Sequence, residues 1–355
     1  MHQRLQPRGV FAAILAACVL TLSVASASRL AQADAVEAAG HAEFSYRTYR
    51  KWKLKLPEPM LAPVGPSIDF ETGLGVKFAT KLDGTRLSID TDGDGETDTK
   101  AEGKEALITL IAKKGDKELP YSIRLQSAAG WRFTVSGAMV GKINGVKVQL
   151  IDQNLNGSYA DFGADAMIVG RGKTACYLSR VANIGGQLFE LSIAEDGTAI
   201  EYSPYTGDRG TLHLGNCKTN AKVLGAVVRS KDHAHSFELS GALAGLQVPA
   251  GTYEVIGGEI GLGQNRVKFD RGRSADITVP KGKTTEVAWG GPVTAEFAYQ
   301  RAGDELHLSP EHVWYYGAAG EQYHAWTPVG KSPRFTISDK KTGREIAQSY
   351  FPGTC

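Results

Sequence analysis

Two stretches rich in aspartate and asparagine could bind a hard metal ion. The first is Asp90-Thr91-Asp92-Gly93-Asp94-Gly95, and the second is Asp152-Gln153-Asn154-Leu155-Asn156-Gly157. Ca²⁺ takes six to eight oxygen ligands at once, and a chain supplies them best from alternate residues of a tightly curved loop with glycine at its sixth position. The spacing therefore predicts one calcium loop in each stretch.

The candidate ligands follow from that spacing. Side chains at positions one, three and five would face the ion, and the residue at position seven would offer its carbonyl. In the first loop a further carboxylate stands at position nine, and in the second two carboxylates lie downstream. The predicted ligands are Asp90, Asp92, Asp94, Glu96 and Asp98 in the first loop and Asp152, Asn154, Asn156, Ser158, Asp161 and Asp165 in the second.

Both loops resemble the calcium loops of EF-hand, dockerin and thrombospondin-repeat proteins. Both depart from the EF-hand at position twelve, where Ala101 and Gly163 stand in place of a bidentate glutamate. The resemblance implies calcium binding, and the departures favour a structural site over a helix–loop–helix sensor. The alternative is a plain turn, because Asp, Asn and Gly are favoured in turns without any ion. If the loops hold calcium, Asp90→Ala or Asp152→Ala should lower thermal stability only when calcium is present.

The elements that must position these loops read as β-hairpins. Asp83-Gly84 and Asn144-Gly145 are turn dipeptides, each followed by an alternating apolar strand that leads into its loop. Similar short alternating segments recur along the chain, and the only helical candidates outside the N-terminus are 31–42 and 104–112. The sequence predicts an all-β protein with two or three β-sandwich or β-sheet units after a signal peptide and a short N-terminal arm.

One pair of strands suggests a known kind of module. Residues 248–255 (VPAGTYEV) and 277–287 (ITVPKGKTTEV) alternate around Pro-x-Gly turns. They resemble the closing strands of carboxypeptidase-regulatory-like, or prealbumin-like, β-sandwiches, which implies a non-catalytic extracellular module. The expected organisation is a signal peptide over 1–27, a proline-rich arm over 28–66, a β domain with both loops over 67–218, the sandwich over 219–290 and a C-terminal β unit over 291–355.

The N-terminus is expected to direct export. Arg4 and Arg8 precede an uncharged apolar run over 10–24, which ends in the small residues Ala25-Ser26-Ala27. A lipoprotein anchored through Cys18 and a retained N-terminal anchor are the alternatives. Without 1–27 the chain keeps 38 basic residues (40 minus Arg4 and Arg8) against 38 acidic ones. A chain with balanced charge argues against nucleic-acid binding, which needs a concentrated basic surface, and no membrane span is expected after the signal.

The remaining candidates concern a disulfide and a ligand surface. Export exposes cysteines to an oxidising compartment, and Cys176 with Cys217 is the preferred pair because both lie in one expected domain. Flat aromatic side chains can stack on sugar rings, although core packing explains the same residues. The candidate ligand surface consists of Trp314, Tyr315, Tyr316, Tyr323 and Trp326.

No catalytic motif was found. The sequence contains no Gly-x-Ser-x-Gly, His-Glu-x-x-His or Cys-x-x-Cys. The sequence therefore predicts an exported calcium-binding β protein with a non-catalytic binding or scaffolding role at the cell envelope or outside the cell. A glycan or an envelope protein is the expected partner. The alternative is a secreted carbohydrate-active or other hydrolytic protein, whose paired carboxylates would be distant in sequence.

Overall fold

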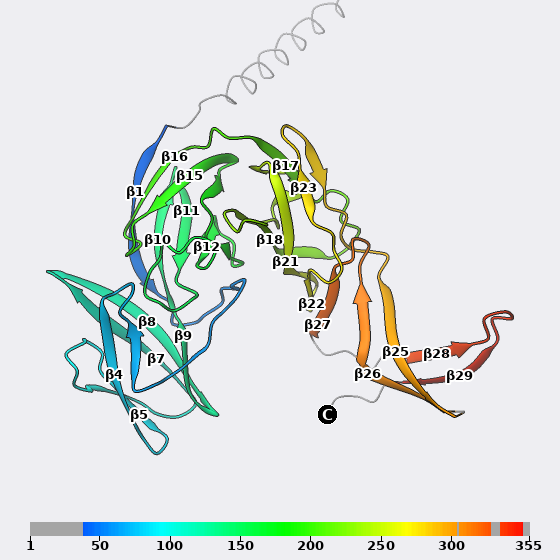
Figure 1. The fold of residues 1–355 in the computed structure, drawn as a ribbon, viewed down its shortest axis with the longest axis horizontal. Helices are drawn as coiled ribbons and strands as arrows, with labels where there is room; N and C mark the ends of the chain where they lie inside the picture. The colour runs from blue at the N-terminus through cyan, green and yellow to red at the C-terminus, as the bar shows by residue number, and fades with distance from the viewer. Residues whose placement is uncertain (1–37, 304, 328–333, 351–355) are drawn as a thin grey trace, which may run out of the picture. The chain divides into compact units, whose positions relative to one another are not determined.

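The computed structural model describes residues 38–303, 305–327 and 334–350 and is built from β-strands (Figure 1). The only helix assigned in this part of the chain is a short 3-10 turn, η1 (Ala242–Ala244). The predicted all-β class with several sheet units is confirmed. No helix in the described segments is long and apolar enough to cross a membrane. The expected signal peptide and Cys18 lie outside the described residues.

One eight-stranded sheet carries the second loop, and the strand nearest the N-terminus lies in its middle. The first half of β1 (Gly40–Thr48) pairs with β16, and its second half pairs with β10. The sheet order is β13 (Cys176–Tyr177), β12 (Ala166–Val169), β11 (Val146–Ile151), β10 (Gly137–Ile143), β1, β16 (Ala199–Pro204), β15 (Gln187–Ile193) and β14 (Val181–Ile184).

The position of β1 corrects the expected N-terminal arm over 28–66. Ala42 and Phe44 are buried and alternate with the exposed residues Glu43 and Ser45, as in a strand with one face on a core. Residues 40–48 are therefore an integral strand of the sheet.

Two four-stranded sheets adjoin the same core. The first carries the first loop and consists of β3 (Ser67–Phe70), β4 (Val76–Asp83), β5 (Arg86–Ile89) and β6 (Thr99–Ala101). The second consists of β2 (Ala62–Pro63), β9 (Gly130–Val135), β8 (Lys117–Ala128) and β7 (Glu105–Lys114).

Strand β7 corrects the helical candidate over 104–112. Alanine and lysine favour a helix there, but Ile108, Leu110 and Ala112 are buried at every second position. They face the core, and β7 pairs with β8 along all its ten residues. Burial of every second side chain in the core therefore outweighs the helix propensity of this segment.

The second eight-stranded sheet continues across residue 290, the predicted boundary between the sandwich and the C-terminal unit. Residues 251–253 of β21 pair with β23, so the two stretches that suggested a sandwich are neighbours. The sheet consists of β19 (Ser236–Glu238), β18 (Lys222–Ser230), β21 (Gly251–Leu262), β22 (Asn265–Asp270), β27 (Gln322–Thr327), β26 (Glu305–Tyr316) and β25 (Thr294–Ala302), with β23 (Ile277–Val279) on β21. The smaller sheets are β20 (Leu246–Pro249), β17 (Arg209–His213) and β24 (Thr284–Glu286), and β28 (Arg334–Ser338) with β29 (Glu345–Tyr350).

Buried apolar side chains form two cores. The first core draws on residues from Ala42 to Ile200 together with Val227. The second core draws on residues from Val181 to Tyr323. Both aspartate-rich loops belong to the part of the chain that builds the first core.

Candidate metal centre

Matched hairpins lead into the two loops. Strands β4 and β5 pair from Asp83 opposite Arg86, and strands β10 and β11 pair from Ile143 opposite Val146. The second turn has Asn144 at φ 49° and Gly145 at φ 76°. Positive φ at both turn positions matches the right-handed twist of two paired strands. Both predicted hairpins form, and each delivers an aspartate to the start of its loop. The first turns at Gly84-Thr85, one residue after the predicted Asp83-Gly84, because Asp83 still pairs with Arg86.

Asp90 organises the first loop from inside. Its side chain is fully buried. One carboxylate oxygen accepts the N–H groups of Asp92 at 3.1 Å and Gly93 at 2.7 Å, and the other accepts that of Gly95 at 2.9 Å. The backbone of the loop is thereby curled around a single carboxylate.

Three carboxylates converge in this loop. Ligand oxygens of Asp90, Asp92 and Asp98 all lie within 4.8 Å of one another. Asp98 is fixed by Thr91, whose N–H donates at 2.9 Å and whose hydroxyl donates at 2.7 Å. Desolvation acts to raise the pKa of Asp98, but these hydrogen bonds outweigh it and the pKa is lowered. The carboxyl is therefore held as the anion.

The loop is also tied to the neighbouring sheet. The Thr91 carbonyl accepts the N–H of Ile111 on β7 at 2.8 Å, and the Lys113 ammonium lies 3.3 Å from the Asp92 carboxylate. Neither contact was expected from the sequence, because nothing local pairs a loop with a strand some 20 residues downstream. An ion in this loop would sit where two sheets meet.

Two of the predicted ligands in the first loop face elsewhere. Asp94 is exposed and accepts the N–H of Glu96 at 2.8 Å in a local turn. Glu96 is exposed as well. The structure therefore brings together three of the five residues predicted for this loop.

The second loop also begins with a buried aspartate, but different groups donate hydrogen bonds to its carboxylate. Asp152 is fully buried, and one of its oxygens accepts the Gly157 N–H at 2.6 Å and the Tyr121 hydroxyl at 2.8 Å. The other oxygen accepts the Asn156 N–H at 3.3 Å. Tyr121 comes from β8 and packs against Phe70 with ring centroids 4.4 Å apart. A core tyrosine thus supplies a donor that the first loop lacks.

Amide groups surround the second carboxylate of this loop. The side-chain amides of Asn154 and Asn156 donate to the same Asp161 oxygen at 3.1 and 2.6 Å. Asn156 in turn accepts the Ser158 N–H at 2.9 Å. Asp161 is therefore stabilised by neutral donors.

Asp165 is the third carboxyl of the second loop. It is fully buried, one oxygen accepts the Asp161 N–H at 3.0 Å, and the other has no hydrogen-bond partner. Burial, and then the nearby charge of Asp152, raise the pKa of Asp165; burial also raises the pKa of Asp152. Asp152 accepts three hydrogen bonds and Asp165 one, so Asp165 is the carboxyl of the pair that more readily keeps a proton. Among the described residues, the carboxylates of the second loop do not form a trio like that of the first.

The aromatic candidates do not form one exposed surface. Tyr323 belongs to the second core at 5% exposure, whereas Trp326 is 49% exposed. Tyr315 packs edge-on against Trp326 at 5.9 Å, and the Arg273 guanidinium covers the Tyr316 ring at 4.1 Å. Trp314 stacks with a histidine at 6.2 Å.

The carboxylate next to these aromatics has a structural role. Glu321 is fully buried and accepts the Gly290 N–H at 2.6 Å, the Tyr323 hydroxyl at 3.0 Å and the Ala319 N–H at 3.1 Å. A carboxylate enclosed by these donors is not placed to act on a sugar. No observation at this patch favours the hydrolase alternative.

The predicted disulfide is corrected. Cys176 and Cys217 are both free in the structure. Cys176 is buried in the first core, where its thiol donates to the Met167 carbonyl at 3.5 Å, while Cys217 packs against the second core. Burial raises the pKa of the Cys176 thiol to about 12, so it stays protonated.

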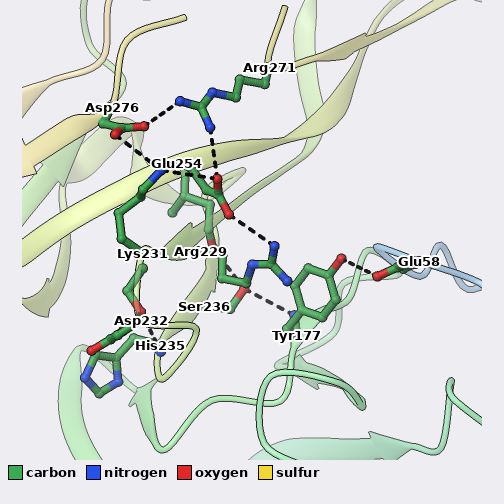
Figure 2. Close-up of polar contacts among 12 residues, drawn as sticks. Glu58, Tyr177, Arg229, Lys231, Asp232, His235, Ser236, Glu254, Arg271 and Asp276 are labelled. Atoms are coloured by element: carbon green, nitrogen blue, oxygen red, sulfur yellow. Dashed lines mark hydrogen bonds and ion pairs between the residues drawn. The ribbon is translucent and has the colours of Figure 1, made fainter.

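A polar network joins the two halves of the described chain (Figure 2). The Arg229 guanidinium lies over the Tyr177 ring at 4.6 Å, and the Tyr177 hydroxyl donates to Glu58 at 3.0 Å. At the centre is Glu254, whose side chain is 14% exposed. Its cationic partners are Arg271 at 3.0 Å, Arg229 at 3.1 Å and Lys231 at 3.8 Å. Ion pairs of this kind stabilise the packing of the strands. Both carboxylate oxygens of Glu254 are occupied by cationic partners.

Comparison with known proteins gives no relative. No protein-family model matches the chain, and no match was found among curated proteins or solved structures.

Proposed function

We propose that the first loop binds a structural calcium ion through Asp90, Asp92 and Asp98. The observation that carries the proposal is the convergence of these three carboxylates within 4.8 Å. At that separation two unit charges repel by about 1 kcal/mol in water and by more at lower dielectric. Lys113, at 3.3 Å from Asp92, offsets one of the three charges. A divalent cation would offset the remaining two.

The donor set favours calcium among divalent ions. All three side chains offer carboxylate oxygen, which suits hard cations and not the nitrogen- and sulfur-preferring metals. The site is buried at Asp90 and exposed at Asp98, so carbonyl groups and water would complete an irregular shell. Ca²⁺ accepts such a shell, whereas Mg²⁺ demands near-ideal octahedral geometry.

The role proposed for the whole protein is non-catalytic. Its support is the signal-like N-terminus, the all-β architecture and a loop whose charges need a cation. The protein would be exported and would act as a binding or scaffolding component of the cell envelope or the extracellular space. Calcium would fix the loop between β5 and β6 against β7. A glycan or another envelope protein is the proposed partner.

Calorimetric titration of calcium into the chelator-stripped protein, with its melting temperature followed in parallel, tests the proposal. Asp92→Asn keeps the shape of the side chain and removes a ligand charge, so calcium affinity should fall about tenfold or more. Its melting temperature in chelator should stay at the wild-type value or rise. Asp83→Asn, in the hairpin before the loop, is the matched control.

Two results would overturn the proposal. One is the absence of both heat and thermal stabilisation on calcium addition to the wild type. The other is an Asp92→Asn variant that binds as many ions as tightly as the wild type. A second ion retained by Asp92→Asn would belong to the second loop and leaves the proposal for the first intact.

A further inference from the structure

A cavity of about 530 Å³ lies between the segment 52–59 and the second eight-stranded sheet. Its size falls within the range of ordinary small-molecule sites. Apolar side chains make up most of its walls, and these come from both sides of the cavity. They include Trp52, Leu54, Leu56, Pro57, Val227 and Ile256.

The sheet side of the cavity carries a row of polar residues fixed by strand register. Gly225 on β18 lies opposite Glu259 on β21, Glu259 lies opposite Lys268 on β22, and Lys268 lies opposite His324 on β27. Directly opposed residues project from the same face of a sheet. All four residues line the cavity. Glycine at the end of the row leaves room for Thr174, whose hydroxyl would lie only 2.3 Å from an added Cβ.

The charges in this cavity do not cancel. Lys55 and Glu259 neutralise each other at 2.5 Å, and Arg266 approaches the same carboxylate at 3.9 Å. His324 lies 3.5 Å from Asp270, which is outside the lining. With histidine neutral, the lining holds three cations, Lys55, Arg124 and Lys268, and one anion, Glu259, which gives a net charge of 3 − 1 = +2.

Arg124 has hydrogen-bonding capacity to spare. Its guanidinium lies over the Trp52 ring at 5.6 Å, and its Nε is buried without a hydrogen-bond partner. Lys268 is exposed and has no ion pair among the contacts of the described residues. An apolar cavity lined by two such cations is suited to an anion, since a guanidinium and an ammonium both gain most from a charged acceptor.

We propose that this cavity binds a small amphiphilic acid, a molecule with an apolar body and one carboxylate. The body would lie on the walls formed by the segment 52–59, and the carboxylate would be held by Arg124 and Lys268. The site is separate from both aspartate-rich loops, and the inference does not depend on calcium binding.

Isothermal titration of the purified protein with octanoate in chelator tests the inference. Octan-1-ol serves as the uncharged analogue, and glucuronate as an acid with a polar body. Octanoate should bind, and both comparison compounds should bind at least about tenfold more weakly, because each lacks one half of the recognised chemistry. Lys268→Gln should weaken octanoate binding about tenfold, whereas Lys100→Gln on β6, remote from the cavity, should leave it unchanged.

Lys268→Gln is preferred to Arg124→Gln because Arg124 packs on Trp52 and its loss could disturb the fold. An unchanged melting temperature in Lys268→Gln makes its titration interpretable, and Arg124→Gln then serves as the second variant. The inference fails if octanoate does not bind, if octan-1-ol binds equally well, or if Lys268→Gln and Lys100→Gln behave alike. Tighter binding of glucuronate would also overturn it and point to an acidic sugar.

Discussion

The two aspartate-rich loops start alike and then diverge. In each, a fully buried aspartate accepts the N–H of the glycine five residues later, at 2.9 Å from Gly95 and 2.6 Å from Gly157. The first loop then gathers two more carboxylates around Asp90. The second directs a tyrosine hydroxyl and two asparagine amides at its carboxylates.

The difference shows two ways to stabilise negative charge in a turn. Neutral donors inside the protein can satisfy a carboxylate completely, and they need no ion. Converging carboxylates cannot satisfy one another, because they have no protons to donate. The spacing of Asp, Asn and Gly is shared by both loops and does not decide between these solutions. The residues that decide are the asparagines at positions three and five and Tyr121 on another strand.

Replacing the first aspartate of the second loop should cause the largest loss of stability among the substitutions that test this comparison. Asp152→Ala leaves the Tyr121 hydroxyl and the Gly157 N–H buried without an acceptor, which should cost about 3–4 kcal/mol of unfolding free energy. The loss should be the same in chelator and in calcium, measured by urea denaturation. This revises the expectation from the sequence that the loss would require calcium. Asp90→Ala should also destabilise the protein in chelator, because Asp90 accepts three backbone N–H groups, and its loss should be larger in calcium, because Asp90 is also a proposed ligand. A loss seen only with calcium would show that an ion holds this loop as well.

The pH dependence of stability tests whether the second loop, unlike the first, holds a protonated carboxyl. The pKa of Asp165 is raised to about 9, so its carboxyl is protonated in the folded state while the unfolded chain ionises near pH 4. The resulting stability is complete below about pH 4 and is lost as pH rises towards 9. Between pH 5 and 8 the wild type should lose about 4 kcal/mol more than Asp165→Asn, which mimics the neutral carboxyl, since each pH unit between the two pKa values costs about 1.4 kcal/mol.

Denaturation of both proteins in chelator at the two pH values measures this difference, with Asp83→Asn as the control for charge. Equal losses in wild type and Asp165→Asn would mean that Asp165 is ionised in the folded protein. Such a carboxylate would be available to a metal, and the two loops would be more alike than their hydrogen bonds indicate.

A single substitution can give the second loop an additional carboxylate and so make its chemistry more like that of the first. Asn156→Asp retains the oxygen that accepts from Ser158 but places a second anion beside Asp161. It should destabilise the protein by about 1 kcal/mol in chelator, and added calcium should restore the loss. Melting temperatures with and without calcium give the result, and Asn265→Asp in an exposed hairpin is the control. A loss that calcium does not reverse would show that carboxylate number alone does not make this loop a cation site.

Local signals in the sequence predicted the parts of the site that depend on neighbours in the chain. Turn dipeptides and alternating strands act over a few residues, and both predicted hairpins form, the first with its turn shifted by one residue. The buried aspartate at the start of each loop follows from the same short pattern. Asp98 was predicted as a ligand at position nine of the same loop, and the structure brings it together with Asp90.

Contacts between distant segments could not be predicted. The Asp152 carboxylate is satisfied by a tyrosine 31 residues away, and strand β1 finds partners about 100 and 160 residues downstream. The helical candidate over 104–112 is strand β7, and what selects the strand is burial of Ile108 and Leu110 in the first core. The 530 Å³ cavity depends on four strands in register against an extended segment.

The central place of β1 has a consequence for how this chain reaches its folded state. Its partners on β10 and β16 lie far downstream in the chain, at Gly137–Gly141 and Ala199–Tyr202. Closing loops of that length costs chain entropy and is therefore slow. The sheet cannot be completed until the distant strands of the first core are available for pairing. A chain whose central strand must wait for such distant partners completes its main sheet late in folding, so that sheet depends on nearly the whole first core being in place.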